Sequence, residues 1–450
     1  MLHWAFLLAN RYITANSRRL ARSGGCSPHW LIRRIASAKL VRTLRHVWRH
    51  SPYQRRRWQD AGIRLADLRS PRVLPHIPFC DPTELAVNPD PFVCVRPEQI
   101  TDMILTSGTT GQAKKIYFTT GDLHRQARMI GGHLRRLPGA SRVFVILSVG
   151  LQPAASPALI ARRGVEMAGM FGLISTAGAT IRMVTDLIRE YHIDTLISSP
   201  TRMHQITLES EVELRTLGVR YLLLSSEPWT EKLRTFLEEA WGAKALDVYA
   251  ANESACGMAS ECAYRNGLHV AEIDFWIEIV NPETGEPLED GEEGEIVFTT
   301  LSRRGMPLVR YRIGDLACLL PVTGRCACGM ALRKLSRISG RADNMVILGD
   351  GFNVYPDEFD EAILGIPGVT DYQLVLEKDG YRDVLRLDVE SDLEGKTLTD
   401  TMIRTLMRIN NVRIKAEIYP GLVFGPIRSV PRGSLSAGRS KTVRIVDKRT

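Results

Sequence analysis

A short loop rich in serine, threonine and glycine is the first segment whose residue types could do chemistry. It reads TSGTTG, and two strand-like runs flank it within 102–119. Its glycines let backbone N–H groups point toward an anion and its hydroxyls add donors, so the loop can hold phosphate. It is not a Walker loop, because the Gly-Lys-Ser/Thr ending is missing. A plain Ser/Thr/Gly hairpin turn is the alternative. The candidate residues are Thr106, Ser107, Gly108, Thr109, Thr110 and Gly111.

Three cysteines and one histidine form a second candidate site. Cys262 and His269 are spaced C-x6-H, and after a long gap Cys326 and Cys328 form a C-x-C pair. Three thiolates and one imidazole make a closed tetrahedral set, the usual composition of structural zinc, with no open position for catalysis. The alternative is that all four are ordinary buried residues, because C-x-C is less diagnostic than C-x-x-C. Cys256 could replace one ligand.

The elements that must position these residues alternate between helix and strand. Three segments have helical periodicity with a polar face, and three short apolar runs are typical of buried strands. The helices are expected at 33–50, 120–137 and 230–240, and the strands at 143–149, 195–199 and 221–225. This alternation favours an α/β fold with parallel sheets. From Trp276 onward, WIEIV and EIVFTT indicate antiparallel strands joined by turns.

A domain boundary is expected after Gly340. Roughly 110 residues follow it, which is enough for a small domain. They contain their own helices and two predicted strands, at 384–389 and 412–418. The chain is therefore predicted to be a large domain followed by a small one.

Composition and charge exclude several classes of protein. Hydrophobic residues make up 44% and charged residues 24%, as in ordinary globular proteins, and no apolar run is long enough for a transmembrane segment. The net charge is +9, but thirteen Lys or Arg and no acid precede Asp60, so the remaining chain carries −4. A nucleic-acid groove is therefore not expected. Three interpretations of the basic arm remain open: it could present a solvated basic face, contact anionic lipid or act as an organelle-targeting segment.

The cysteine content bears on the compartment. Eight cysteines in 450 residues are too sparse and too uneven for a disulfide framework. Reduced thiols and a cytoplasmic location are therefore predicted.

Five segments, in order, resemble the motifs of the adenylate-forming superfamily, which contains acyl-CoA synthetases, nonribosomal adenylation domains and luciferases. TSGTTG resembles its phosphate loop, YAANE its Tyr-Gly-x-Thr-Glu motif and YRIGD its Tyr-Arg-x-Gly-Asp motif. Segment 340–363 resembles its hinge, and 433–447 its C-terminal lysine loop. Within the superfamily, SSEPWTE, SPYQRRRWQDAGI and NPETGEPL are most similar to the phenylacetate-CoA ligase branch. The resemblance runs from about Leu40 to the C-terminus.

The resemblance implies an α/β fold with a definite division of the chain. A basic N-terminal arm (1–40) would precede a large N-terminal domain (41–341) of parallel-rich sheets with helices and a small β-barrel-like part. A smaller, mobile α+β C-terminal domain (344–450) would follow, with its hinge at Asp343. Some members of the branch also carry zinc in an arrangement similar to the Cys/His set described above.

The resemblance also implies roles for individual residues. Glu253 would hold Mg²⁺, and Lys441 would be the adenylation lysine. Asp315 would accept hydrogen bonds from both ribose hydroxyls, Arg341 would approach the ribose or phosphate, and the ring of Tyr249 would stack on adenine. The other residues expected in the ATP and acyl pockets are Glu227, Pro228, Trp229 and Asn252.

The sequence departs from the family at several positions. The phosphate loop continues as QAKK instead of Gly-Lys-Pro, so Lys114 or Lys115 could contact phosphate from a shifted position. Asn252 replaces the usual Thr, and Ser440 replaces the Gly before the lysine. The expected acyl-pocket region, 150–177, resembles the branch only loosely, and its small residues fit an apolar pocket or close helix packing.

The predicted activity is ATP-dependent activation of a small-molecule carboxylic acid to an acyl or aryl adenylate, with release of pyrophosphate. Transfer to a thiol, that of coenzyme A or of a carrier protein, would follow. Two alternatives remain open: transfer to an amine, and a nucleotide-binding module without turnover. The oligomeric state is also open, with a homodimer as one alternative.

Overall fold

The computed structural model describes most of the chain, in two compact units. The described residues are 27–105, 114–147, 156–175, 179–226, 229–322, 324–342, 346–348, 352–354, 356–379, 382–417, 422–436 and 443–448. One unit comprises Met1–Ser226 and Glu238–Ile338, and the other Glu227–Leu237 and Ser339–Thr450.

A mixed sheet forms the centre of the first unit. In the described part of the chain its strand order is β13-β9-β8-β7-β6-β5-β3-β4. The five strands from β7 to β4 are parallel, and β8, β9 and β13 continue the sheet in antiparallel pairing. The bounds are β3 Arg142–Ile146, β4 Phe171–Ile174, β5 Thr195–Ser198, β6 Tyr221–Leu224, β7 Lys244–Ala251, β8 Cys256–Ser260, β9 Leu268–Val270 and β13 Lys334–Leu335. The predicted parallel-rich α/β sheet is confirmed.

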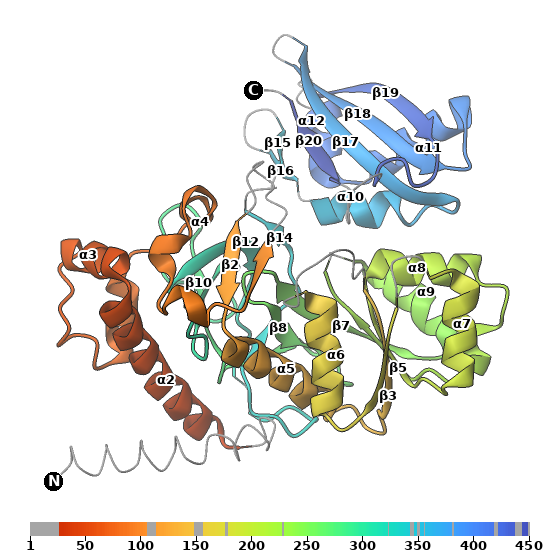
Figure 1. The fold of residues 1–450 in the computed structure, drawn as a ribbon. Helices are drawn as coiled ribbons and strands as arrows, with labels where there is room; N and C mark the ends of the chain where they lie inside the picture. The colour runs from red at the N-terminus through yellow and green to blue at the C-terminus, as the bar shows by residue number, and fades with distance from the viewer. Residues whose placement is uncertain are drawn as a thin grey trace. The chain divides into compact units, whose positions relative to one another are not determined.

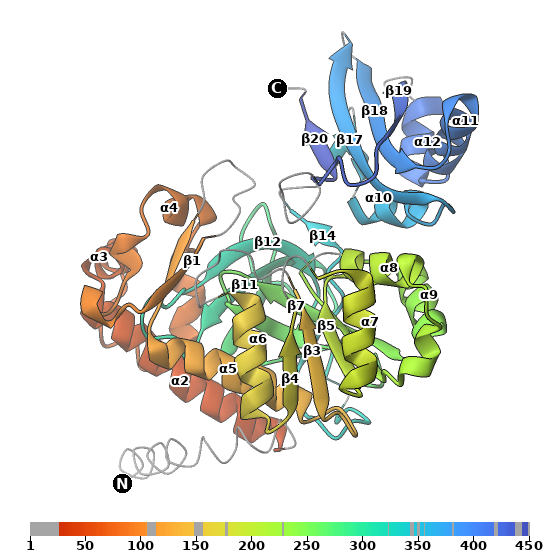
Figure 2. The same cartoon turned by 45° about the vertical axis from the view of Figure 1, so that its right-hand side comes forward.

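Helices cover both faces of this sheet. α5 and α6 lie on one face and α7 and α8 on the other (Figures 1 and 2). Each begins after a Ser or Thr whose side chain accepts a backbone N–H, which satisfies a donor that the first turn leaves unpaired. The bounds are α5 Thr120–Leu134, α6 Pro157–Met167, α7 Ile181–Glu190, α8 Pro200–Glu209 and α9 Glu231–Trp241.

α5 and α6 approach each other closely because two glycines face each other. A Cβ at Gly131 would lie 2.6 Å from the carbonyl oxygen of Gly164, and one at Gly164 would lie 2.8 Å from Ile130. At Gly172, in β4, a Cβ would lie 2.7 Å from Val165 of α6. Residues 150–177 were expected to form either an apolar pocket or a region of close packing. At Gly164 and Gly172 the structure shows close packing, of α6 against α5 and of β4 against α6.

Two smaller antiparallel groups complete this unit. β1 pairs with β2 from Asp102↔Phe118 to Leu105↔Lys115, so the expected strands on either side of the phosphate loop are present. β11 lies between β10 and β12 and pairs antiparallel with both, as expected for the segment from Trp276 onward. The bounds are β1 Asp102–Leu105, β2 Lys115–Phe118, β10 Phe275–Val280, β11 Gly294–Thr300 and β12 Tyr311–Ala317.

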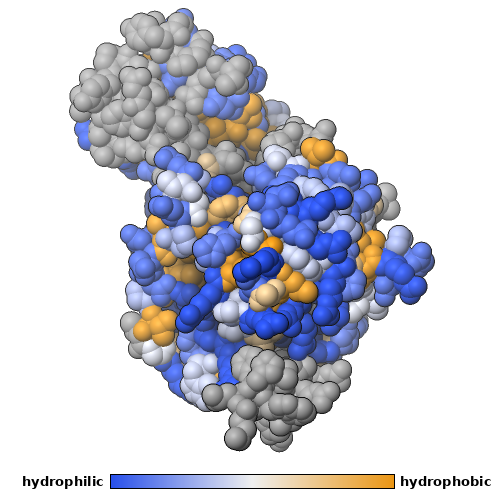
Figure 3. Space-filling model, turned by 90° about the vertical axis from the view of Figure 1, so that its left-hand side faces the viewer, coloured by the Kyte–Doolittle hydropathy of each residue, from blue (hydrophilic) through white to orange (hydrophobic). Residues whose placement is uncertain are grey.

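The described part of the basic arm begins in a long helix, α2 (His29–His50). One of its faces is buried, including Ile32, Leu40 and Trp48, while Lys39 donates to the carbonyl of Ile273 at 2.7 Å. α3 (Pro52–Asp60) and α4 (Pro82–Val87) follow, with short 3-10 turns at Pro71–His76, Asp90–Phe92, Pro97–Gln99 and Leu214–Leu217. Figure 3 shows this side of the molecule as mostly hydrophilic, with apolar residues in small separate patches. None of the described helices combines the length and the apolar character needed to cross a bilayer.

The second unit has its own sheet and core. Its strand order is β19-β18-β17-β20, with β17 and β18 as a long antiparallel pair and the two outer strands parallel to their neighbours. Phe359, Tyr372 and Met402 are among its fully buried residues. The bounds are β14 Gly340–Arg341, β15 Val346–Leu348, β16 Phe352–Val354, β17 Val369–Asp379, β18 Arg382–Ser391, β19 Leu422–Val430, β20 Ile445–Asp447, α10 Pro356–Ile363, α11 Gly395–Leu406 and α12 Asn410–Glu417.

One predicted strand in this unit is wrong. Segment 412–418 was expected to be a strand, but α12 covers it up to Glu417. Its apolar residues alternate, which is typical of a strand, yet Val412 and Ala416 are four apart and both contact the core of this unit. Burial of that one helical face decides the conformation against the local β-propensity of the segment.

Candidate active site and metal centre

The end of β7 positions a buried carboxylate. Glu253 follows this strand in a tight turn, in which Ser254 donates to the carbonyl of Ala251 at 2.7 Å. Gln126 of α5 donates to the carbonyl of Ser254 at 3.0 Å, which holds the turn against the helix. Ala255 adopts φ 68°, so the chain reverses sharply into β8. Glu253 is 7% exposed in this turn, next to Asn252.

A lysine and a tyrosine converge on Glu253. Nζ of Lys114 lies 2.5 Å from Oε1 of Glu253, and the Tyr311 hydroxyl donates to the same oxygen at 3.0 Å. Burial raises the pKa of Glu253, but the ammonium of Lys114 and the hydrogen bonds outweigh it, so the pKa lies below its usual value. The carboxylate is therefore ionised at neutral pH, as a ligand for a hard cation must be.

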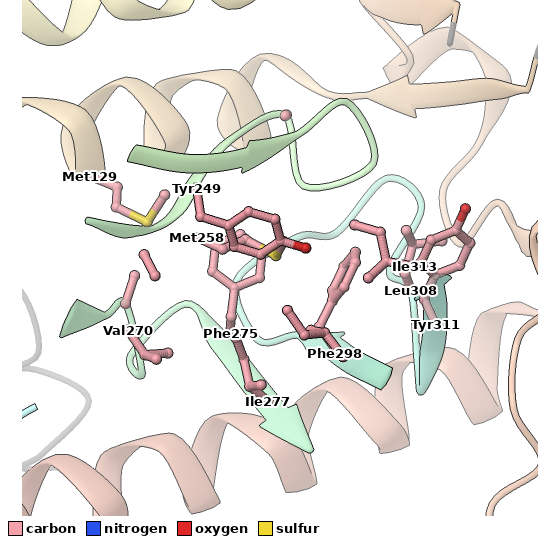
Figure 4. Close-up of a cluster of buried hydrophobic side chains, with 14 of the residues drawn as sticks. Met129, Tyr249, Met258, Val270, Phe275, Ile277, Phe298, Leu308, Tyr311 and Ile313 are labelled. Carbon is pink, nitrogen blue, oxygen red and sulfur yellow. The ribbon is translucent and has the colours of Figure 1, made fainter. Parts of the chain in front are cut away.

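Two further predicted residues form a second pair beside this one. The hydroxyl of Tyr249, on β7, donates to Oδ2 of Asp315, on β12, at 2.5 Å. Both residues are buried, at 7% and 8% exposure. Figure 4 shows the rings of Tyr249 and Tyr311 among the apolar side chains of the core below, including Phe275 and Phe298. The structure thus brings Tyr249, Asp315, Asn252 and Glu253 into one region of the first unit.

Two of these contacts were missed in the sequence. Lys114 was expected near phosphate and not beside Glu253, and no role was expected for Tyr311. A signal for Tyr311 existed, because it belongs to the same YRIGD motif as the predicted residue Asp315.

Several predicted residues cannot be placed. The phosphate-loop residues Thr106 to Gly111, Glu227, Pro228, Asp343 and Lys441 lie outside the described residues, as does the side chain of Arg341. Trp229 is described: it is buried, and the guanidinium of Arg234 lies 4.5 Å from its ring centre. The roles of all these residues remain predictions.

The three predicted thiols and the imidazole come together in the first unit. The ligand atoms of Cys262, His269, Cys326 and Cys328 lie within 4.8 Å of one another. Sγ of Cys262 is 3.8 Å from Sγ of Cys326, and Sγ of Cys328 is 3.4 Å from Nε2 of His269. Zinc–sulfur bonds of about 2.3 Å in a tetrahedron place two sulfurs about 3.8 Å apart, so the spacing fits zinc.

Local backbone geometry explains how the two ligand pairs meet. Gly267 has φ 103°, and a Cβ there would lie 2.6 Å from Leu320 and 2.9 Å from the carbonyl of Leu335. Glycine is therefore needed for the turn between Cys262 and His269. Opposite, the backbone N–H of Cys326 donates to Met330 at 2.9 Å, which closes the turn that carries the C-x-C pair. The side chain of Cys256, the alternative ligand, is outside the described residues.

The surroundings shift the pKa values of these groups in different directions. Burial raises the pKa of the Cys328 thiol to about 12. Burial, together with the charges of Lys334 and Arg136, lowers the pKa of His269 to about 4. The imidazole is therefore neutral and ready to bind, and a thiol would lose its proton to a metal ion.

Comparisons with known proteins agree with this geometry. The profile described as AMP-binding enzyme matches residues 40–302, and that described as AMP-binding enzyme C-terminal domain matches residues 351–449. The phenylacetate-coenzyme A ligase of Escherichia coli is 32% identical over 428 residues, which are 92% of this chain and 94% of that protein. The Pseudomonas putida phenylacetate-coenzyme A ligase is 30% identical over 416 residues, 90% of this chain and 92% of that protein.

Solved structures share the fold. The 2-hydroxyisobutyryl-CoA ligase in its postadenylation state, in complex with 2-HIB-AMP, matches with a TM-score of 0.76 at 20% identity, over 94% of this chain and 91% of that one. The matches to the two profiles and the two ligases confirm the resemblance seen in the five motifs. The chain belongs to the AMP-binding enzyme family of adenylate-forming ligases, in its phenylacetate-CoA ligase branch.

Proposed function

We propose that the protein activates a carboxylic acid with ATP, forming an acyl adenylate and pyrophosphate, and then transfers the acyl group to coenzyme A. One contact carries the proposal: Lys114, three residues after the last glycine of TSGTTG, touches Glu253 at 2.5 Å. It brings the flank of the phosphate loop to the carboxylate that the family uses for magnesium. The nearby Tyr249–Asp315 pair supplies a ring and a carboxylate for the nucleoside.

The reaction brings an anionic carboxylate to a polyanionic phosphate, and the chain supplies groups that offset the repulsion. At an effective dielectric constant of about 20, two like unit charges 4 Å apart repel by about 4 kcal/mol. Glu253 would hold Mg²⁺, which screens the phosphate charge when bound. Asp315 would orient the ribose, and the ring of Tyr249 would stack on adenine. Lys441 would stabilise the charge that develops during adenylation.

The substrate class follows from the relatives. Proteins named phenylacetate-coenzyme A ligase are 30–32% identical to this chain over most of its length. We therefore propose an arylacetic or other aromatic acid as substrate, and coenzyme A as the thiol acceptor.

We also propose that the four-residue Cys/His set holds a structural zinc ion. Its composition and spacing support this, because three thiols and an imidazole close the coordination sphere.

The six described free cysteines are consistent with a reducing, cytoplasmic location, which we propose as well. The division at Asp343 is supported by a compact second unit that takes in Ser339–Thr450.

The test is carboxylate-dependent exchange of labelled pyrophosphate into ATP by the purified full chain. A panel of phenylacetic, benzoic and fatty acids would be assayed with Mg²⁺, and products would be identified by mass spectrometry with and without coenzyme A. We expect exchange with at least one aromatic acid and an acyl-CoA only when coenzyme A is present. Bound ATP without exchange for any acid would refute the proposal. An amide or a carrier-bound acyl product would show that the acceptor is an amine or a carrier protein and not coenzyme A.

A further inference from the structure

The carboxylate assigned to the metal is already paired with a cation that belongs to the chain. Oε1 of Glu253 lies 2.5 Å from Nζ of Lys114 and accepts a hydrogen bond from the Tyr311 hydroxyl at 3.0 Å. Nζ of Lys114 also donates to that hydroxyl, at 3.2 Å. The two charged side chains are only 17% and 9% exposed, so water screens the pair weakly.

This arrangement solves a problem for the protein without ligands. A buried carboxylate without a partner is unfavourable, and the Lys114 ammonium supplies the missing charge. A divalent ion on the same oxygen, however, would lie next to that ammonium. Two cations so close repel each other, so both cannot occupy Oε1 of Glu253 together.

We propose that Lys114 is an exchangeable counter-cation of Glu253. It neutralises the carboxylate in the free protein, leaves it when the divalent ion arrives with the nucleotide, and then directs its ammonium at the triphosphate. The lysine side chain is long and flexible and lies three residues after the last glycine of the phosphate loop. It can therefore reach either Glu253 or a triphosphate bound at the loop. Lys114 thereby opposes metal binding in the absence of nucleotide. This inference rests on the assignment of Glu253 to Mg²⁺ in the proposed function.

The experiment measures Mn²⁺ binding to the full-length protein without nucleotide. Free Mn²⁺ would be counted by electron paramagnetic resonance at pH 8, where the carboxylate stays ionised. Lys114→Met and Lys114→Gln both remove the ammonium, Lys114→Arg keeps a positive charge, and Lys244→Met removes an exposed charge at the start of β7. We expect the two neutral Lys114 variants to bind Mn²⁺ at least about tenfold more tightly than the wild type. The Arg variant and the Lys244 variant should bind Mn²⁺ as the wild type does.

The double variant Lys114→Met/Glu253→Gln locates the effect. It should lose the gain in Mn²⁺ affinity, because the oxygen that Lys114 releases is then no longer a carboxylate. Unchanged or weaker Mn²⁺ binding by both neutral variants overturns the proposal, and so does a gain that persists without Glu253. Pyrophosphate exchange by the wild type decides the ligase activity separately: exchange without the Mn²⁺ effect removes only the role of Lys114, and the Mn²⁺ effect without exchange leaves the counter-cation standing.

Discussion

The hydroxyl of Tyr249 donates to the carboxylate of Asp315 across 2.5 Å, so the residue expected to stack on adenine also holds the residue expected to bind the ribose. The pair joins β7 of the large sheet to β12 of the small antiparallel group. A bound nucleoside would therefore contact two side chains, one held by each sheet.

Removing either polar group of this pair should weaken ATP binding. In Tyr249→Phe the ring stays but Asp315 loses a donor, so we expect the dissociation constant for ATP to rise about three- to tenfold. In Asp315→Asn the charged acceptor for the ribose is lost, and the rise should be about ten- to a hundredfold. Calorimetric titration measures both, and Tyr264→Phe, at a ring that is 58% exposed, is the control. Unchanged affinity in Asp315→Asn would remove this residue from the nucleotide site.

Lys441 should separate the two half-reactions. Lys441→Ala removes the ammonium expected to stabilise adenylation, and we expect pyrophosphate exchange to fall about a hundredfold or more. Thioester formation from a supplied acyl adenylate should persist, because the lysine is expected to act only in the adenylation step. Lys448→Ala changes an exposed lysine close by in the sequence and should leave both steps intact. If Lys441→Ala kept full exchange activity, the expected role of this residue would be wrong.

The zinc proposal predicts a loss of metal with a matched control. Cys328→Ser should lower bound zinc from about one ion per chain toward zero, as measured by elemental analysis. The variant should also lose about 2 kcal/mol or more of unfolding free energy, because three buried ligand groups lose their common partner. Cys318→Ser changes a free thiol outside the set and should keep the metal. Carefully purified wild-type protein without metal would contradict the proposal.

Asp122 should control stability and its dependence on pH. Its carboxylate accepts the backbone N–H of Arg304 at 2.7 Å and of Gly305 at 2.9 Å, and it pairs with Arg125. Burial raises its pKa, but these bonds outweigh burial and hold the pKa below the usual 3.8. Asp122→Asn should therefore cost about 2–3 kcal/mol at neutral pH.

The sign of the pH effect follows from the lowered pKa. The unfolded chain takes up the proton first as the pH falls, so the stabilisation is complete above about pH 5 and is lost through the lower pKa of the folded state. The difference between wild type and Asp122→Asn should shrink below pH 4 in denaturant titrations. Asp186→Asn, at a carboxylate that is 55% exposed, should change stability by less than about 0.5 kcal/mol. An equal cost at pH 3 and pH 7 would show that Asp122 acts through packing alone.

The sequence was sufficient for the features that depend on local pattern. The parallel strands at 195–199 and 221–225 were predictable because each is a short apolar run between helices, and their residues are almost all buried. The Cys/His set was predictable from ligand types and spacing. In contrast, α12 was predicted as a strand, because the contacts of its buried side with the core of the second unit form only in the folded protein and leave no local pattern in the sequence.

The polar contacts of the site depend on three-dimensional proximity and could not be derived. Lys114 and Glu253 are far apart in sequence, and nothing in QAKK indicates which partner the lysine takes. Tyr311 was recognisable as part of a motif, but its bond to Glu253 depends on how β12 crosses near the end of β7. Such pairs follow from the tertiary arrangement and not from any short segment.

The Cys/His set joins two turns that are 64 positions apart, measured from Cys262 to Cys326. The chain between them contains β10, β11 and β12, and with them Asp315. An ion bound there would act as a cross-link between the two ends of this segment. A link that closes a loop of this length reduces the entropy of the unfolded chain, which favours the folded state by about 4 kcal/mol in the loop-entropy model. If an ion is bound there, metal starvation would thus impair nucleotide use by loosening a stretch of polypeptide, although none of the four Cys/His side chains is expected to react.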